Sequence, residues 1–120
     1  MGDTIQKRLA ALGVTLPPAA APAGSYVPFA QTGKLILTSG QLPFSDGKLA
    51  ATGLVGRDLD VAAGKEAAKL CAINVLAQLQ AATDDLEKIA RLVKITVFVA
   101  STPDFTEQHL VANGASDFLV

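Results

Sequence analysis

The sequence predicts a single globular domain of the α+β class. Three patterns lead to this prediction: a β-hairpin signal in the first half of the chain, a long proline-free helical segment in the middle, and an alternating apolar segment followed by a second helix. A chain of 120 residues, half of them apolar, also has the length and composition of one ordinary domain. We therefore expect residues 1–120 to form one domain, in which residues 1–24 are an N-terminal helix and a Pro/Ala-rich arm.

Charge and composition exclude several classes of protein. The chain has 10 basic and 11 acidic residues and no block of Lys or Arg, which argues against a dedicated DNA-binding protein. Its apolar runs are shorter than the roughly 18 residues that span a membrane, and its first residues do not form a secretory leader, so we expect a cytoplasmic protein. A single cysteine far from the single histidine predicts no internal disulfide and no metal site.

The first elements are a short helix and an extended arm. Asp3 is placed to cap the helix, with Gln6 three residues later in a capping-box relation, and Gly13 fits a left-handed stop. Leu16–Gly24 contains three prolines, which favour an extended connection. The apolar stripe of the helix is expected at Ile5, Leu9 and Leu12.

A hairpin follows the arm. We expect one strand at Tyr26–Phe29, a turn at Gln31–Lys34 and a second strand at Leu35–Ser39. Pro28 lacks a backbone N–H and should lie at an edge or a bulge. The next segment is broken by glycine and proline, so Leu49–Val55 is either a weak strand or a loop.

The longest predicted helix covers about Val61–Ala82, because this segment has no proline and is rich in strong helix formers. Asp58 and Asp60 precede it and offer capping oxygens. The helix has two apolar faces, so either neighbouring loops or another subunit should cover the second one. The first face carries Ala68, Ala72, Val75, Leu76 and Leu79, and the second carries Leu70, Ala77 and Ala81.

The last third of the chain is expected to hold a strand and a second helix. Thr83–Asp85 ends the long helix and can cap one further turn, and Arg91–Val99 alternates as a half-buried strand does. Thr102 before Pro103 is typical of a helix start. That helix is still apolar at Val120, and a sheet covered by two helices would need a further strand, so we expect the sequence to be incomplete at its C-terminus.

Several of these segments together resemble the reactive intermediate deaminase family, also called the YjgF family and formerly labelled translation initiation inhibitor or endoribonuclease L-PSP. The similarity extends over Gly24–Val120, and the N-terminal helix and the insertion around Arg57 place the chain near a longer, less characterised branch. The segments that carry it are Gly24-Ser25-Tyr26, Leu35-Ile36-Leu37-Thr38-Ser39-Gly40-Gln41-Leu42-Pro43, the alanine-rich helix, Val93–Val99, Pro103-Asp104-Phe105 and Asn113.

The resemblance implies a chorismate-mutase-like fold, in which a mixed sheet has two helices on one side. It also implies a homotrimer that closes around a central barrel, with sites in the clefts between subunits. Deaminases of this family hydrolyse reactive enamines and imines, such as 2-aminoacrylate, to a keto acid and ammonia. They use no metal and no organic cofactor, so the implied partner is a small anionic imine or enamine.

The same resemblance implies four substrate-binding residues, which are Tyr26, Ser39, Gly40 and Asn113. Tyr26 would line the cleft, and the Ser39–Gly40 pair would hold substrate or water through a hydroxyl and a backbone N–H. In the family, an arginine clamps the substrate carboxylate and a glutamate assists the water. Both follow the second helix, so we expect them beyond Val120 and assign no catalytic residue here.

Each of these residues also has a purely structural interpretation. Tyr26 can be a half-buried packing residue, Ser39 a turn residue, and Asn113 with Gly114 a kink in a helix. Cys71 fits a small buried hydrophobe and His109 a solvated side chain. Arg57 is either paired to Asp58 or Asp60 within its loop, or a substitute anion-binding residue.

Two other functions remain open from the sequence. The first is a small-molecule-binding or regulatory module that keeps the fold without deaminase activity. The second is RNA cleavage with translational inhibition, which follows only from the older family label. The near-neutral charge and the few aromatic residues argue against RNA as a partner.

Overall fold

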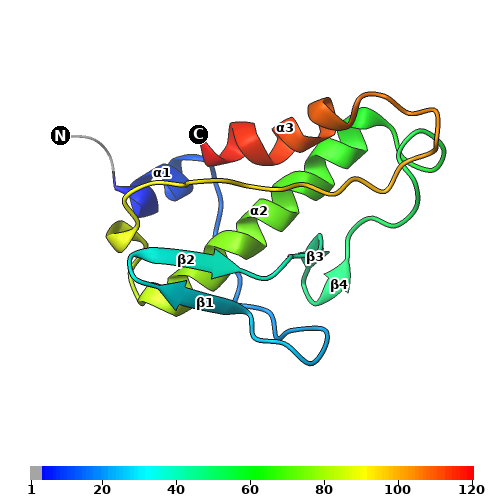
Figure 1. Cartoon of the computed structure of the whole chain (residues 1–120). Coiled ribbons are helices and arrows are strands. Elements are labelled where there is room, and N and C mark those ends of the chain that lie inside the picture. Colours follow the sequence, from blue (N-terminus) through cyan, green and yellow to red (C-terminus); the bar gives the residue numbers. More distant parts are fainter. Residues whose placement is uncertain (1–3) are drawn as a thin grey trace. The chain divides into compact units, whose positions relative to one another are not determined.

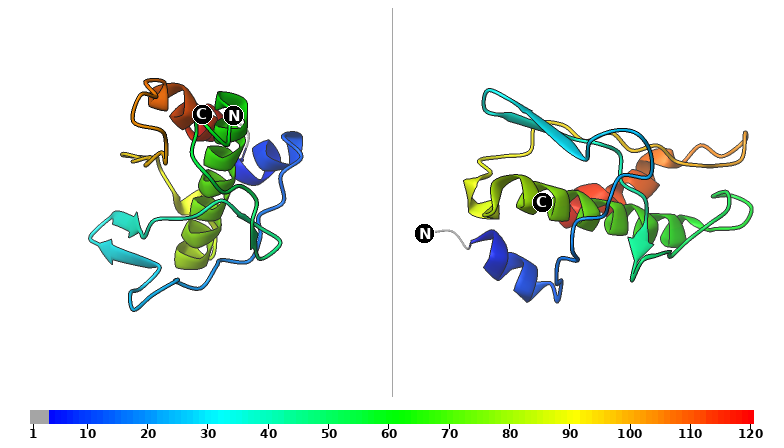
Figure 2. Two further views of the ribbon diagram at one scale, coloured as in Figure 1. Left: turned by 90° about the vertical axis from the view of Figure 1, so that its right-hand side faces the viewer. Right: turned by 90° about the horizontal axis from the view of Figure 1, so that it is seen from below.

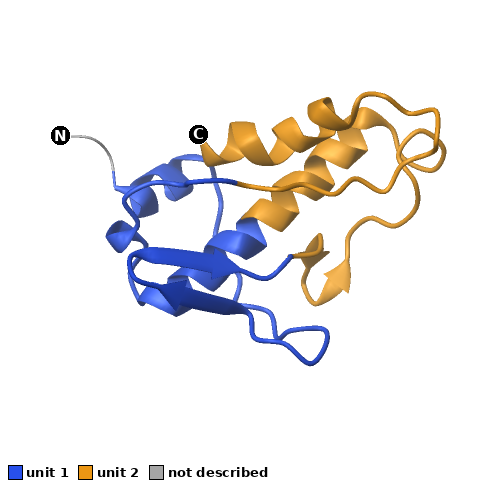
Figure 3. Cartoon of the chain, viewed as in Figure 1, with its two compact units in different colours: residues 1–40, 73–94 blue, residues 41–72, 95–120 orange. Residues whose placement is uncertain are grey.

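The computed structural model describes residues 4–120, in which helices and short strands are both present (Figure 1). It divides into two compact units (Figure 3): residues up to 40 with residues 73–94, and residues 41–72 with residues 95–120. The elements are α1 (Ile5–Ala11), β1 (Phe29–Thr32), β2 (Leu35–Thr38), β3 (Phe44–Ser45), β4 (Lys48–Leu49), α2 (Val61–Thr83), the 3-10 turn η1 (Leu86–Lys88) and α3 (Gln108–Leu119).

In the first unit, α1 begins at a different cap from the predicted one. The hydroxyl of Thr4 accepts a hydrogen bond from the N–H of Lys7 at 3.1 Å, so Thr4 is the N-cap. Asp3, the predicted cap, lies outside the described residues. The carboxylate of Glu87 satisfies two further N–H groups of the first turn, which is why α1 packs beside η1.

The end of α1 is mostly as expected. Gly13 has φ +72°, the left-handed conformation predicted for the helix stop. Leu9 is buried, whereas Leu12 is 59% exposed and does not continue the apolar stripe. The reason is that the helix ends at Ala11, so Leu12 already belongs to the turn. The arm after it has no helix, in agreement with its prolines.

The β1–β2 hairpin is antiparallel, and Thr32 pairs with Leu35 across a two-residue loop, Gly33–Lys34. The hairpin is confirmed, but its first strand begins at Phe29 and not at Tyr26. Tyr26 instead closes a tight turn, because its N–H donates to the carbonyl of Gly24 at 2.9 Å. Pro28 lies just before β1 and not within a strand, so its missing N–H interrupts no bond between β1 and β2.

The C-terminal half of α2 organises the rest of the first unit. Gln78 is only 1% exposed and donates from Nε2 to the carbonyl of Ala20 at 2.8 Å, which fastens the arm to this helix. Leu86 of η1 is also 1% exposed. This 3-10 turn confirms the further turn that the sequence predicts after α2. Asp85 caps it, because its carboxylate accepts a hydrogen bond from the N–H of Glu87.

In the second unit, β3 and β4 form a second short hairpin that the sequence pattern did not predict as strands. Its turn uses Asp46 and Gly47, both at positive φ. Most of the following segment, 50–60, is a loop anchored by Val55, which is 4% exposed and bridges to both Leu59 and Ser101.

The first part of α2 packs against α3, and the two helices lie side by side in Figures 1 and 2. The side chain of Asp60 accepts from the N–H of Ala63 at 2.8 Å, so the predicted cap of α2 is confirmed. The helices approach closely because small residues meet at their contact. The core between them consists of Ala68, Ala72 and Ala115, with Phe118 and Leu119 packed against it.

The predicted strand at Arg91–Val99 is wrong as a paired strand. Within residues 4–120 this segment is extended but joins no ladder, and pairing occurs only beyond it, at the bridge between Ser101 and Val55. Alternating sequence fixes which side chains share a face, but a strand also needs a hydrogen-bonded neighbour. The alternation is visible only at the end of the segment, where Val97 and Val99 are half-buried and Phe98 is 93% exposed. Val93 and Ile95, on the same face as Val97 and Val99, are exposed.

The predicted start of the last helix, at Thr102 and Pro103, is also wrong. Thr102 and Pro103 belong to a turn, and α3 begins only at Gln108. The N–H of Thr102 is held by the carbonyl of Val55 at 3.1 Å, which aligns this residue with the bridge instead of with a helix. Among the described helices, none combines the length and apolar character that a membrane span requires.

Candidate functional site

Tyr26 lies in a turn that holds its ring in place. A Cβ atom at Gly24 would come within 3.1 Å of the ring, so the missing side chain lets the ring fold over the preceding turn. The phenol oxygen accepts a hydrogen bond from the N–H of Ala23 at 3.3 Å. The side chain is 50% exposed, and its own O–H proton can still be donated to another group.

Ser39 is fixed by the carbonyl of Pro28. Its N–H donates to this carbonyl at 2.9 Å and its hydroxyl donates to the same oxygen at 3.2 Å. Because Pro28 is two residues after Tyr26, the contact places Ser39 at the same end of the hairpin as the tyrosine turn. Gly40 follows directly, with open space at its Cβ position. The first unit thus brings three of the four predicted binding residues to one hairpin end.

Asn113, the fourth predicted residue, belongs to the second unit. It is half-buried on α3, one residue before Gly114. Gly114 contacts the backbone carbonyl of Lys65 on α2, so the residue pair lies at the crossing of two helices. The glycine is explained by this close contact, and no kink is needed to account for it.

Arg57 forms the pairing within its loop that the sequence left open. Its guanidinium bonds the carboxylate of Asp58, with Nη2 2.9 Å from Oδ2. The same carboxylate accepts from the N–H of Leu54 at 2.8 Å. The hydrogen bond from Arg57, together with the one from Leu54, lowers the pKa of Asp58 from its ordinary value. Arg57 remains 66% exposed, whereas Asp60 serves α2 as a cap.

Two other reactive side chains belong to the second unit. Cys71 is half-buried on α2, and burial raises the pKa of its thiol, as expected for a cysteine that acts as a small hydrophobe. His109 is exposed near the start of α3, as predicted for a solvated histidine.

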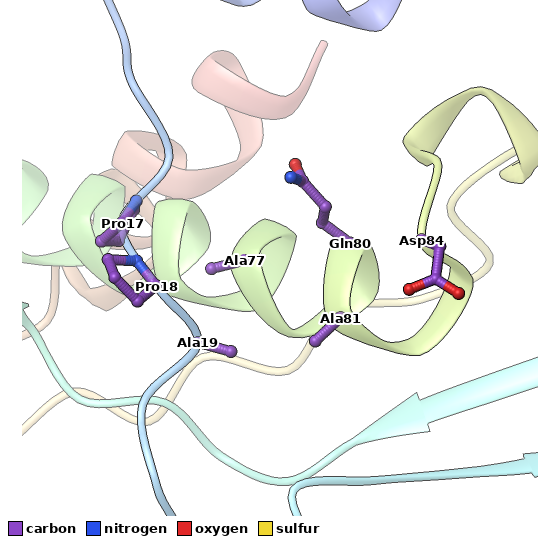
Figure 4. Close-up of a pocket in the computed structure, with 7 residues that line it drawn as sticks. All are labelled: Pro17, Pro18, Ala19, Ala77, Gln80, Ala81 and Asp84. Atoms are coloured by element: carbon purple, nitrogen blue, oxygen red, sulfur yellow. The ribbon is translucent and has the colours of Figure 1, made fainter.

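A cavity of about 280 Å³ opens between the arm and the C-terminal end of α2 (Figure 4). The sequence predicts the arm only as a connector and does not predict this cavity. The one signal was the second apolar face of α2, since Ala77 and Ala81 of that face form part of the lining. The other lining residues are Pro17, Pro18, Ala19, Gln80 and Asp84.

Comparison with known proteins places the chain in a family. Residues 6–120 match the family described as "YjgF/chorismate_mutase-like, putative endoribonuclease". The chain is 47% identical over 116 residues to Protein TCP17 of Trypanosoma cruzi, which covers 97% of this chain and 72% of that protein.

Two crystal structures have similar folds. The protein Atu1372 from Agrobacterium tumefaciens, which has unknown function, is 55% identical with a TM-score of 0.87, over 96% of this chain and 69% of that one. A "putative endoribonuclease" from Shewanella oneidensis is 33% identical with a TM-score of 0.87, over 97% of this chain and 77% of that one.

The fold is therefore that of a mixed α+β, chorismate-mutase-like protein. This chain belongs to the YjgF/chorismate mutase-like family. The α+β class and the family resemblance predicted from the sequence are both confirmed.

Proposed function

We propose that this protein hydrolyses small anionic enamines and imines, of the 2-aminoacrylate type, to a keto acid and ammonia without a cofactor. Family membership supports the proposal, because the resemblance implies this chemistry. The structural observation that supports it most directly is the Pro28 carbonyl, which holds Ser39 beside the turn of Tyr26. Ser39 and Gly40 follow the last residue of β2 at the end of the hairpin where the Tyr26 turn precedes β1.

The reaction needs water at the imine carbon and a proton at the nitrogen. An enamine first takes up a proton at its terminal carbon and loses one from nitrogen, which gives the imine. Water then adds to the C=N carbon, and the resulting carbinolamine expels ammonia and leaves the keto acid. Tyr26 suits the role of hydrogen-bond donor, because the N–H of Ala23 already occupies one acceptor position of its oxygen and leaves its own proton for the substrate. A half-exposed ring can also cover a small substrate.

Ser39 and Gly40 are proposed to hold the water and the substrate carboxylate. The Ser39 hydroxyl donates its proton to the carbonyl of Pro28, and a hydroxyl oxygen is also able to accept a hydrogen bond from water. The N–H of Gly40 would donate to the carboxylate, in space that no neighbouring side chain fills. Asn113 is proposed as a further substrate-binding residue, because the family resemblance implies it. The carboxylate clamp and the water-directing glutamate of the family are assigned to no residue of this sequence.

The proposed site is completed by other copies of the chain in a cytoplasmic homotrimer. Leu35 and Leu37 lie on one face of β2 and are 39% and 57% exposed, and Val27 nearby is 65% exposed. Exposed apolar side chains grouped on a strand face are typical of a surface that packs against a partner. Light scattering after size-exclusion chromatography should give three times the chain mass.

The activity can be tested by adding the protein to a pyridoxal-phosphate enzyme that generates 2-aminoacrylate from serine. We expect ammonia and keto-acid release above the rate in buffer. Tyr26→Phe and Ser39→Ala should each reduce the added rate by about 10²-fold, because each removes a group that positions a proton or water. Ser45→Ala, an exposed serine of β3, is the matched control. A rate equal to buffer would exclude the proposed activity.

RNA cleavage is the second candidate, because the matching family and the protein from Shewanella oneidensis are both described with the word endoribonuclease. Incubation with a labelled single-stranded RNA tests it directly. Cleavage that is lost in Tyr26→Phe, without any release of ammonia in the first assay, would favour this candidate. Binding of a small carboxylate with neither activity would instead identify a binding or regulatory module.

A further inference from the structure

The cavity between the arm and α2 is a second candidate binding site, separate from the hairpin end. Its apolar walls are the two prolines of the arm and the alanines of the helix, and Gln80 and Asp84 add polar groups (Figure 4). The buried amide of Gln78 holds the arm through Ala20, so the wall opposite the helix is fixed in place. A volume of about 280 Å³ is just below the roughly 300 Å³ at which pockets for drug-sized ligands begin, which favours a small ligand.

Asp84 carries a negative charge at a helix end that favours a cation. Its φ is +61°, in the left-handed region that Asp and Asn adopt more readily than most other side chains do. Its negative charge lies at the C-terminal end of α2, where the helix dipole is also negative and favours cations. The last turn of α2 has no basic residue that could pair with Asp84. The ion pair found within residues 4–120 joins Arg57 to Asp58 and does not involve Asp84.

The negative charge at this end of the cavity favours a cationic group. We propose that this cavity binds a primary ammonium group on a short alkyl chain. The N–H donors of an ammonium match the carboxylate of Asp84, which lines the cavity at its polar end. The alkyl chain would contact Pro17, Ala77 and the neighbouring apolar walls. A divalent metal ion fits poorly, because it needs several oxygen ligands and the cavity has one carboxylate.

The test is an NMR titration of the full ¹⁵N-labelled chain with n-butylammonium chloride at constant ionic strength. We expect saturable shifts of the amide signals of Ala19 and of residues 77–84. Titration with 1-butanol, which has the same alkyl chain without the charge, should give no saturation. Absence of saturation with the ammonium, or equal saturation with the alcohol, would overturn the proposal.

Three variants make the test specific. Asp84→Asn keeps a residue that tolerates positive φ but removes the charge, and should weaken binding about tenfold. Asp117→Asn, at an exposed position of α3, is the matched control and should bind as the native chain does. Ala81→Leu should fill the cavity and abolish the shifts. Unchanged affinity in both Asp84→Asn and Ala81→Leu would show that the ammonium binds elsewhere.

Two sources of the same ammonium chemistry can be separated in this titration. N-acetyl-lysine methylamide presents the alkylammonium group as a lysine side chain of a protein partner does. Tighter binding of this probe than of n-butylammonium would indicate a lysine of a partner protein. Tighter binding of n-butylammonium would indicate a free amine. The proposal does not depend on deaminase activity, so its outcome is independent of that assay.

Discussion

Gly114 on α3 lies against the backbone carbonyl of Lys65 on α2, so closely that a Cβ atom at position 114 would overlap this carbonyl. Val111 lies one turn before Gly114 on α3, and its side chain faces Gly64, the residue before Lys65 on α2. A Cβ atom at Gly64 would be 3.1 Å from the two methyl groups of Val111. The two glycines therefore set the distance between the helices. They differ in what they meet, since one contacts rigid backbone and the other contacts a side chain.

This difference predicts two different effects of the same substitution. Gly114→Ala should lower the free energy of unfolding by about 3 kcal/mol, because the helices must separate to admit the methyl group. Gly64→Ala should change it by about 1 kcal/mol or less, since the strain on Val111 is offset by the better helix propensity of alanine. Urea denaturation followed by circular dichroism measures both. Equal effects would contradict the backbone contact.

The tether between the arm and α2 gives a second prediction. Gln78→Ala removes the hydrogen bond to Ala20 and leaves a hole at a buried position, so it should destabilise the protein by about 1–3 kcal/mol. It should also speed proteolytic cleavage of the arm within residues 16–24. Gln80→Ala, two residues along the same helix but exposed, should stay within about 0.5 kcal/mol of the native chain. Similar cleavage of both variants would argue against the tether.

The elements that the sequence predicted well depend on local interactions. The helix at Val61–Thr83 follows from strong helix formers without proline and from the cap at Asp60. The stop at Gly13 follows from a conformation that suits glycine. The elements that it predicted wrongly depend on contacts distant in sequence. Whether residues 91–99 form a strand depends on a neighbour to pair with, and the start of α3 depends on the bond between Thr102 and Val55.

The candidate site shows the same limit. Tyr26 and Ser39 could be singled out only through the family resemblance, because a lone tyrosine and a serine before glycine are common in turns. The bond of Ser39 to Pro28 could not be predicted, since it depends on the hairpin register. The cavity at Asp84 was missed for a similar reason, because the arm and α2 that form it are about 60 residues apart in the sequence.

The loop around Arg57 should respond to acid. The pKa of Asp58 is lowered because its carboxylate accepts hydrogen bonds from Arg57 and from the N–H of Leu54. The stabilisation that the carboxylate gives the loop is therefore present above the ordinary Asp value of 3.8 and is lost as the pH falls through the lowered pKa. The amide shift of Leu54 should titrate with a midpoint below 3.8, and Arg57→Ala should raise that midpoint. A midpoint that does not move in Arg57→Ala would refute the pairing.

Cys71 should react slowly in the folded protein. Burial raises the pKa of its thiol, so the fraction of reactive thiolate near neutral pH is lower than in an exposed cysteine. Alkylation by iodoacetamide at pH 8 should be at least about tenfold slower for the native chain than for the chain unfolded in urea. Mass spectrometry of the modified peptide gives both rates. Equal rates would mean that Cys71 is accessible and ionised as in the unfolded chain.

The last prediction concerns the docking of α1. Glu87 accepts from the N–H groups of Ile5 and Gln6 at 3.0 and 3.3 Å, and its charge also complements the positive end of the helix. Glu87→Ala should cost about 1 kcal/mol, and the loss should be local to α1 because the other contacts of the first unit remain. Hydrogen exchange of the Ile5 and Gln6 amides should become faster, while exchange at Gln78 stays unchanged. Glu66→Ala, an exposed glutamate of α2, is the control and should leave all three rates as they are. Slow exchange at Ile5 in Glu87→Ala would show that Thr4 alone is enough to cap the helix.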